Sequence, residues 1–520
     1  MRCEGWCFFV AKKTLFRTTM AVTLLIFVSK AGGFLREIVM TAYYGAGAEM
    51  DAYNMAYSLY YVPVLLFNSC ITSTLVPVYA QVRRNEPERL ERFSSNVISL
   101  FAVFAIAASV LMYLLAGPLV SLLAGGFTAE GQALTARLLR TMLPSLCFIV
   151  TSIVLSSILN ARENYLAAQL TGFPLTFALL IATIGFSNTM GVRALAWGVF
   201  FSGILQVLVL LPAMRKIHGF RPSFDFSDPH FRRLMLLAGP AVMNMAVNEL
   251  NHMVDKMLAS SLPAGHLTCM NLAFKLITFL VGVVLVPLET IMFSKMSMKT
   301  AAHDEKGLSR MVMRSMELVA LIIFPIIAVG AIMPGDVIRL AYKHGVFSEA
   351  SVSAAGIALR FYILGVFSYG MRDILTRAFN ACQDTRTPML NAVGTVVVNI
   401  VLNVLLVRVM GVGGLALATS ISATVGVVSL MLLLRRRLGR LRGRRTVEEL
   451  LKITIATALA AFVCMLLNHF VPAASTSAGS FGRLVLCTGA SLIVYAAAAI
   501  GLRVRWAMQG VSMIKEKLHR

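Results

Sequence analysis

Long runs of apolar residues, separated by short polar segments, recur along the whole sequence. Fourteen of these runs reach the length of about 20 residues that a helix needs to cross the hydrocarbon core of a bilayer. Backbone polar groups must be hydrogen bonded within such a segment, so each run predicts a membrane-spanning helix. The predicted spans are 19–44, 52–79, 94–123, 133–159, 165–187, 193–213, 234–260, 268–293, 315–334, 354–379, 388–409, 413–434, 450–470 and 483–503.

The composition agrees with an all-α polytopic membrane protein. Of the 520 residues, 58% are hydrophobic and only 14% are charged, whereas soluble domains carry about 25% charged residues. The net charge is +23, but the basic residues lie in short segments between apolar runs rather than in a basic soluble domain. We therefore expect these basic residues to contact membrane lipids and no nucleic acid.

The lysines and arginines lie mainly in alternate connecting segments. The segments on the side of the N-terminus carry 33 of them, whereas the opposite loops carry four: Arg193, Arg339, Lys343 and Arg483. Short loops rich in lysine and arginine stay in the cytoplasm. We therefore expect both termini inside.

The spans divide into two lobes of six helices, followed by two further helices. A shift of 218 residues places Glu37 on Asp255 and Gly47 on Gly265, which indicates an internal repeat of the kind found in transporters. The expected parts are a cytoplasmic N-terminus (1–18), an N-lobe (19–215), a basic cytoplasmic linker (216–233), a C-lobe (234–434), a basic cytoplasmic loop (435–449), helices 13 and 14 (450–503) and a basic cytoplasmic tail (504–520).

Two cations lie within the first span, in the segment LLIFVSKAGGFLREIVM. Lys30 and Arg36 are six residues apart, so they point about 120° apart and can border one wide cavity. A basic residue deep in hydrocarbon costs about 2.5–3.5 kcal/mol, which favours a polar interior, and arginine can bind phosphate through two N–H groups. We interpret the pair as a site for a phosphate or pyrophosphate. The alternative is that each cation pairs with an acid, Arg36 with the adjacent Glu37.

The seventh span is unusually polar. Asn244, Asn248, His252 and Asp255 follow one another at spacings of four, four and three residues and so share one helix face. Such a stripe suits the wall of a water-filled cavity or a cation path, and its alternative role is hydrogen bonding between helices. In the eighth span, Lys275 has no acid among its immediate neighbours in the sequence, which makes it a third candidate cation for the cavity.

Amide and hydroxyl groups recur in the eleventh and twelfth spans. Asn399 and Asn403 are four residues apart, and Thr419 begins a short run of small polar residues. Together with one carboxylate, such oxygens can bind a hard cation such as Na⁺, although helix packing is the favoured interpretation of these residues alone. The sequence has no His/Cys metal spacing, GxSxG motif or phosphate-binding loop, which argues against an enzyme and against nucleotide-driven transport.

Six segments are specific in combination: SKAGGFLRE (29–37), GAGAEMDAY (45–53), LVPVYAQ (75–81), NHMVDKMLASSLPAG (251–265), AFNACQDTRTP (378–388) and GLALATSISA (414–423). With them the chain resembles, over nearly its whole length, the MurJ (MviN) lipid II flippases of the multidrug/oligosaccharidyl-lipid/polysaccharide exporter superfamily. The resemblance implies two lobes around a cationic cavity, alternating access, and a groove for the polyprenyl tail at helices 13 and 14.

By position, the resemblance implies that the headgroup binds at Lys30, Arg36, Glu37, Asp51 and Lys275. It also implies a central Na⁺, as a coupling or structural ion, at Asp255, Asn399, Asn403, Thr419 and the carbonyl of Leu415.

The chain departs from the family pattern at three places. Asn403 stands where an acid is expected, and lysines replace arginines at positions 30 and 275. The second span lacks the usual arginine pair, because YYVPVLLFNSCITST is uncharged. We expect these departures to affect which lipid-linked cargo is bound and how strongly the ion is held.

We therefore expect a transporter and not an enzyme. The resemblance implies that lipid II, the lipid-linked peptidoglycan precursor, moves from the inner to the outer leaflet of the bacterial cytoplasmic (inner) membrane. The alternatives are a flippase for another polyprenyl-pyrophosphate-linked glycan and a cation-coupled exporter of the MATE type. Cell-wall synthesis proteins are candidate partners.

Overall fold

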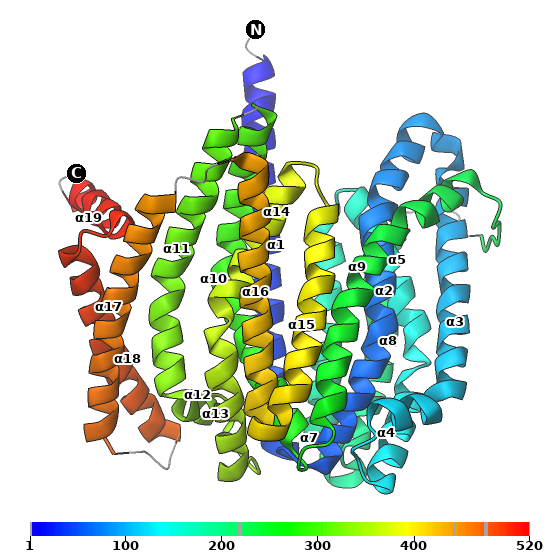
Figure 1. Ribbon diagram of the computed structural model, residues 1–520. Coiled ribbons are helices and arrows are strands. Elements are labelled where there is room, and N and C mark those ends of the chain that lie inside the picture. Colours follow the sequence, from blue (N-terminus) through cyan, green and yellow to red (C-terminus); the bar gives the residue numbers. More distant parts are fainter. Residues whose placement is uncertain (1–2, 216–220, 303, 440–442, 473–476, 519–520) are drawn as a thin grey trace. The chain divides into compact units, whose positions relative to one another are not determined.

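The computed structural model describes residues 3–215, 221–302, 304–439, 443–472 and 477–518. The described chain is helical and contains no strand, as the apolar runs predict (Figure 1). Its internal contacts divide it into two compact units, residues 1–261 and 262–520, which we call unit 1 and unit 2.

Unit 1 begins with a long helix and contains one broken span. Helices α4 and α5 meet at a bend of 45°, where Pro144 lacks the N–H that would continue the helical hydrogen bonds. The pair covers the predicted span 133–159. The helices of unit 1 are α1 (Cys3–Tyr44), α2 (Ala48–Asn85), α3 (Leu90–Leu123), α4 (Ala129–Met142), α5 (Ser145–Ala161), α6 (Tyr165–Gln169), α7 (Pro174–Met190), α8 (Arg193–Met214) and α9 (Pro229–Ala259), with 3₁₀ turns η1 (Pro87–Arg89) and η2 (Leu170–Gly172).

Unit 2 contains a second broken span. Helices α13 and α14 meet at Gly365 with a bend of 42° and together cover the predicted span 354–379. The helices of unit 2 are α10 (His266–Ala301), α11 (Glu305–Ile332), α12 (Pro334–Tyr342), α13 (Glu349–Leu364), α14 (Val366–Ala381), α15 (Arg386–Met410), α16 (Val412–Leu438), α17 (Gly443–Phe470), α18 (Ser477–Gly501) and α19 (Arg505–Leu518).

The described residues contain ten helices long and apolar enough to cross a membrane, or twelve candidate spans when each bent pair is counted as one. The two other predicted spans, 19–44 and 234–260, lie on α1 and α9, which are outside this set. The polar stripe of α9 lowers the hydropathy of that helix. The multi-pass helical fold is thus confirmed, whereas the count of fourteen and the orientation stay predictions.

The turn between the fifth and sixth spans is shorter than the sequence indicates. We expect the turn at SNTMG, but α7 continues to Met190 and α8 begins at Arg193. Gly191 has φ +56° and ψ −143°, a backbone conformation that essentially only glycine adopts. The helix therefore ends at this glycine and not at the polar residues before it.

Helix α9, which we expect in the C-lobe, belongs to unit 1 because it packs along α2. Lys256 of α9 donates a hydrogen bond to Ser58 Oγ of α2 at 2.6 Å. The linker before α9 is described from residue 221, and residues 216–220 lie outside the description. It is bound to α3, where Asn96 forms two hydrogen bonds of 2.8 Å with the backbone of Asp225. The division into lobes of six helices stays a prediction.

Two glycines matched by the internal repeat hold equivalent places in the two units. Gly47 directly precedes α2, and Gly265 directly precedes α10. Gly265 has φ +89°, which glycine adopts without strain, whereas Gly47 is extended. The equivalent helix starts support the repeat, although the two backbones differ locally.

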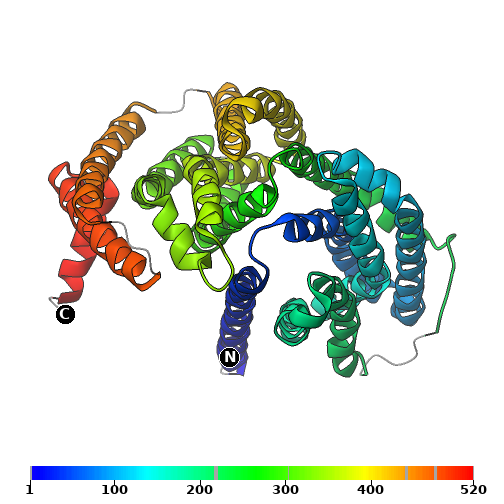
Figure 2. The same ribbon diagram turned by 90° about the horizontal axis from the view of Figure 1, so that it is seen from below.

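The C-terminal helices pack on α11 within unit 2 (Figure 2). Small residues of α17 and α18 form a buried cluster with Ala320 of α11, and small side chains allow such close helix approach. Thr446 donates a hydrogen bond of 2.8 Å to the buried Glu317, and the hydroxyl of Tyr495 donates one of 2.7 Å to the carbonyl of Leu321. Both helices of the pair are therefore hydrogen bonded to neighbouring turns of α11.

Candidate functional site

The cations predicted on the first span lie in different environments on α1. Lys30 is exposed in unit 1. The Arg36 side chain is only 16% exposed, and its Nη2 lies 2.8 Å from Oε1 of Glu37. Its Nε is buried and has no hydrogen-bond partner. The pairing of Arg36 with Glu37 is therefore present, and it leaves one guanidinium donor uncommitted.

A row of tyrosines on α2 lies within electrostatic range of Arg36. Tyr53, Tyr57 and Tyr61 are spaced by four residues, and their rings stack with centroids 6.0 and 5.6 Å apart. Arg36 interacts electrostatically with all three. Their i, i+4, i+8 spacing in DAYNMAYSLYY is visible in the sequence, but uncharged side chains by themselves do not indicate a site for an anionic ligand. The uncharged second span thus presents aromatic rings and hydroxyl groups.

Asp51 lies in the first turn of α2, where it is 3% exposed. A carboxylate at this place is stabilised by the positive end of the helix dipole. Its position therefore supports a structural role in starting α2, beside the headgroup role that the resemblance implies.

The polar stripe of α9 lies in unit 1. Asn248 and His252 are partly buried and Asp255 is buried, and all three have polar or ring interactions. The side chain of Asn244 lies outside the described residues. The adjacent Glu249 is also buried, so this helix holds two carboxylates within unit 1.

The remaining candidate residues belong to unit 2. Lys275 is partly buried on α10 and has interaction partners. Asn399 of α15 donates to Ser422 Oγ at 3.2 Å and accepts from Asn403 at 2.8 Å. Thr419 of α16 donates to the carbonyl of Leu415 at 2.9 Å, and it lies 3.5 Å from the amide nitrogen of Asn399.

The four predicted cation ligands of unit 2 thus form one hydrogen-bonded cluster: Leu415, Asn399, Asn403 and Thr419. Their oxygens have the hard character that Na⁺ requires, and that of Thr419 also accepts from Asn399 between α16 and α15. The fifth predicted ligand, Asp255, belongs to unit 1. Among the described residues, no group of three His, Cys, Asp or Glu side chains can hold a metal.

The QDTRTP motif forms the connection between α14 and α15. Asp384 accepts hydrogen bonds from the backbone N–H and the hydroxyl of Thr387, at 3.0 and 2.8 Å, and pairs with Arg437 of α16 at 2.7 Å. The Thr387 N–H bond, together with the hydroxyl and Arg437, lowers the pKa of Asp384 below its ordinary value. The motif therefore caps α15 and ties it to the end of α16.

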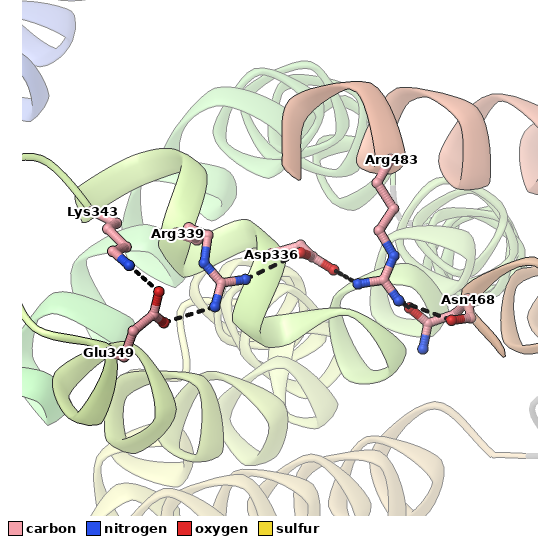
Figure 3. A network of polar contacts seen from close by, with 6 residues as sticks. All are labelled: Asp336, Arg339, Lys343, Glu349, Asn468 and Arg483. Carbon is pink, nitrogen blue, oxygen red and sulfur yellow. Dashed lines mark hydrogen bonds and ion pairs between the residues drawn. The ribbon is translucent and has the colours of Figure 1, made fainter. Parts of the chain in front are cut away.

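A polar network connects the C-terminal helices to α12 and α13 (Figure 3). Arg483 of α18 lies 3.1 Å from Asp336 Oδ2 and donates to Asn468 of α17 at 2.7 Å. Asp336 also faces Arg339 at 3.5 Å, and Arg339 pairs with Glu349 at 2.7 Å. Lys343 forms a second ion pair with Glu349. We call these residues the clasp: Asp336, Arg339, Lys343, Glu349, Asn468 and Arg483. It contains three of the four basic residues of the loops predicted outside, which the sequence alone did not connect.

The sequence of this chain is similar to those of lipid II flippases. The family model "Lipid II flippase MurJ" matches residues 40–484. The probable lipid II flippase MurJ of Rhizobium meliloti (strain 1021) is 27% identical over 512 residues, covering 95% of this chain and 94% of the relative. The lipid II flippase MurJ of Burkholderia cenocepacia is 26% identical over 437 residues, covering 81% and 84%.

Solved structures show the same fold. A lipid II flippase MurJ in an inward closed conformation has a TM-score of 0.77 at 22% identity, covering 93% of this chain and 99% of that one. An inward-facing MATE family transporter of the MOP superfamily has a TM-score of 0.68 at 13% identity, covering 80% and 96%. Because the family model spans most of the sequence, the chain belongs to the lipid II flippase MurJ family.

Proposed function

We propose that this protein moves lipid II from the inner to the outer leaflet of the cytoplasmic membrane. Family membership over residues 40–484 carries the proposal, and the spans make the chain a multi-pass protein of that membrane. The polyprenyl tail stays in the bilayer while the polar headgroup crosses, and the two lobes expose it alternately to each side. The process is transport, without a chemical step on the cargo.

Arg36 is the proposed diphosphate anchor. Glu37 holds its guanidinium from one side, while the uncommitted Nε–H can donate to a phosphate oxygen. A charge-assisted bond of this kind is stronger than a neutral one, and more so in a site shielded from water. Lys30 supplies further positive charge in unit 1, and Lys275 is the headgroup cation that the family resemblance implies in unit 2.

The tyrosine row is the proposed contact for the sugars. Tyr57 is partly buried and Tyr61 is 38% exposed, so both can meet a ligand. Each ring offers an apolar face for a sugar ring and a hydroxyl for its polar groups. In this chain the row supplies binding surface on α2, where the arginine pair is missing.

Na⁺ is the proposed coupling or structural ion. The oxygens of Asn399, Asn403, Thr419 and Leu415 in unit 2 would replace water in its shell, and Asp255 is the carboxylate that the family resemblance implies for it. With an amide at position 403, the site carries one formal charge and is expected to bind the ion weakly. Retained Na⁺ dependence of transport in an Asp255→Asn variant would contradict this assignment.

The C-terminal pair is the proposed guide for the tail. Helices α17 and α18 carry exposed apolar side chains such as Phe462, Leu466 and Ile493, while their other faces are fixed to α11 and α12. Cell-wall synthesis proteins stay candidate partners.

The proposal is tested in a strain depleted of its own lipid II flippase. Arg36→Ala and Lys275→Ala should fail to restore growth and should leave lipid II in the inner leaflet, whereas Arg36→Lys should restore part of the function. The matched control is Arg84→Ala, an exposed arginine at the end of α2. Full growth with Arg36→Ala and Lys275→Ala, at wild-type amounts of protein in the membrane, would refute the cationic site.

Another polyprenyl-pyrophosphate-linked glycan is the second candidate cargo, since the diphosphate anchor does not depend on the sugar. Purified protein in nanodiscs distinguishes the two by competition between lipid II and the other lipid. A MATE-type exporter shares the fold, and it would instead show efflux of small amphiphilic cations.

A further inference from the structure

An apolar groove runs along the surface of unit 1 between α7 and α8. It has a volume of about 470 Å³. Ala182 and Gly198 are among its small residues, and a side chain at Gly198 would lie 3.0 Å from Ala182, so the two helices approach closely. The walls include Ile181, Trp197 and Phe201, which are 43–62% exposed. Both helices belong to candidate membrane spans, so the groove faces the bilayer and suits an acyl chain.

A second, charged pocket of about 470 Å³ lies next to the groove. Met190, at the end of α7, lines both spaces. The charged pocket contains Arg137, Arg193, Glu49 and Glu130, which come from α4, α8, α2 and α4. All four side chains are exposed, and none forms an ion pair or a side-chain hydrogen bond with the described part of unit 1.

The charges of this pocket define the headgroup that fits it. Two arginines can hold a phosphate, which guanidinium groups bind through paired N–H donors. Two glutamates can accept hydrogen bonds from a primary ammonium, which has three donors. A headgroup with both a phosphate and a primary amine satisfies both pairs. Phosphatidylglycerol lacks the amine, and the quaternary ammonium of phosphatidylcholine has no N–H to donate.

We propose that unit 1 binds phosphatidylethanolamine, with one chain in the α7–α8 groove and the headgroup between the two arginines and two glutamates. The pocket joins the start of α2, α4 and the start of α8, so the lipid connects three elements of unit 1. These segments lie on the side that the basic-residue distribution assigns to the outer leaflet. None of the proposed lipid II ligands belongs to this site, and the inference stands without the proposed function.

The test measures lipid binding to delipidated full-length protein in detergent. Dioleoyl phosphatidylethanolamine, phosphatidylcholine and phosphatidylglycerol are added one at a time, and bound lipid is counted by native mass spectrometry. We expect phosphatidylethanolamine to bind about tenfold more tightly than either other lipid, since each lacks one charge-assisted contact. Equal binding of all three would overturn the proposal.

Paired substitutions separate the two halves of the headgroup. Arg137→Gln with Arg193→Gln should weaken phosphatidylethanolamine and phosphatidylglycerol alike. Glu49→Gln with Glu130→Gln should remove the advantage of phosphatidylethanolamine over phosphatidylcholine and leave phosphatidylglycerol unweakened. Unweakened binding of phosphatidylethanolamine in the arginine variant would refute the phosphate half, and an unchanged preference over phosphatidylcholine in the glutamate variant would refute the ammonium half. Arg83→Gln with Arg84→Gln makes the same change of charge on exposed residues of α2 and serves as the control.

The groove is tested separately from the charges. Trp197→Ala should weaken all three lipids by a similar factor, because it removes a wall that contacts the chain and not the headgroup. Glycerophosphoethanolamine, which has the headgroup without chains, should not displace the lipid at equal concentration. Displacement would mean that the charged pocket acts alone. Melting curves in lipid-free detergent identify any variant that has lost its fold, and the glutamate pair and Trp197→Ala still test the proposal if the arginine pair fails.

Discussion

Replacing Arg483 with alanine should loosen the attachment of α17 and α18 to α12. Asp336 is 6% exposed, and the change leaves it with Arg339 alone, at 3.5 Å. Removing one partner of a buried ion pair costs about 3–5 kcal/mol. Because Arg339 continues to compensate part of the charge, we expect a value near the lower limit, about 3 kcal/mol.

Two native cysteines report this loss directly. Cys464 and Cys487 are fully buried against Met333, one helical turn from Asn468 and Arg483 respectively. They react with a maleimide only when the interface opens, so about 3 kcal/mol corresponds to labelling on the order of a hundred times faster. Peptide mass spectrometry measures each cysteine separately, and the partly buried Cys147 of unit 1 is the internal reference.

Lys343→Ala provides the matched control within the same clasp. Its partner Glu349 is 51% exposed, and exposed pairs contribute about 0–1 kcal/mol. Labelling of the two cysteines should therefore rise less than about fivefold. If Arg483→Ala accelerates labelling no more than Lys343→Ala, the clasp does not hold the C-terminal helices and the reasoning is wrong.

Three further substitutions test local features. Gly191→Ala should lower stability by about 1–3 kcal/mol, because Gly191 has a positive φ. Gly185→Ala in α7, where the added side chain meets open space, should not lower it. Equal melting temperatures of the two variants would refute this prediction. Thr446→Val should lower the free energy of unfolding by about 1–3 kcal/mol, because it leaves the buried Glu317 without its hydroxyl partner. Thr446→Ser keeps the hydroxyl and should not lower it. Thermal unfolding in detergent measures both variants. The pKa of Asp384 is lowered, so the stability that its carboxylate contributes is present above about pH 4 and is lost as the pH falls through the lowered pKa. Asp384→Asn should therefore flatten the decline in melting temperature between about pH 5 and pH 3. An unchanged decline would contradict the capping role.

The helices could be predicted because a lipid-exposed backbone must satisfy its own hydrogen bonds. That rule fixes where apolar helices run, but not where they break. The bend at Pro144 depends on one residue inside the span 133–159, and the end of α7 depends on the backbone conformation of Gly191. The polarity of α9 was visible in the sequence, yet its packing along α2 depends on side chains far apart in the chain, as with Lys256 and Ser58.

The candidate site was predictable where the signal was local. Arg36 and Glu37 are adjacent, so their pairing was one of the two interpretations that the sequence offered. The bond between Asp336 and Arg483 joins residues 147 positions apart, and no periodicity links them. The tyrosine row had a clear helical spacing, but aromatic residues are so common in apolar spans that only the nearby cation distinguishes Tyr57 and its neighbours.

The clasp has a consequence for the direction of transport. In unit 2, the basic side chains of the loops predicted outside, Arg339, Lys343 and Arg483, are bound to Asp336 and Glu349. A diphosphate arriving at this face would have to displace a carboxylate to be held there, whereas Arg36 still has an uncommitted donor. The clasp would therefore hold an anionic headgroup only weakly at this face of unit 2, which favours its release there.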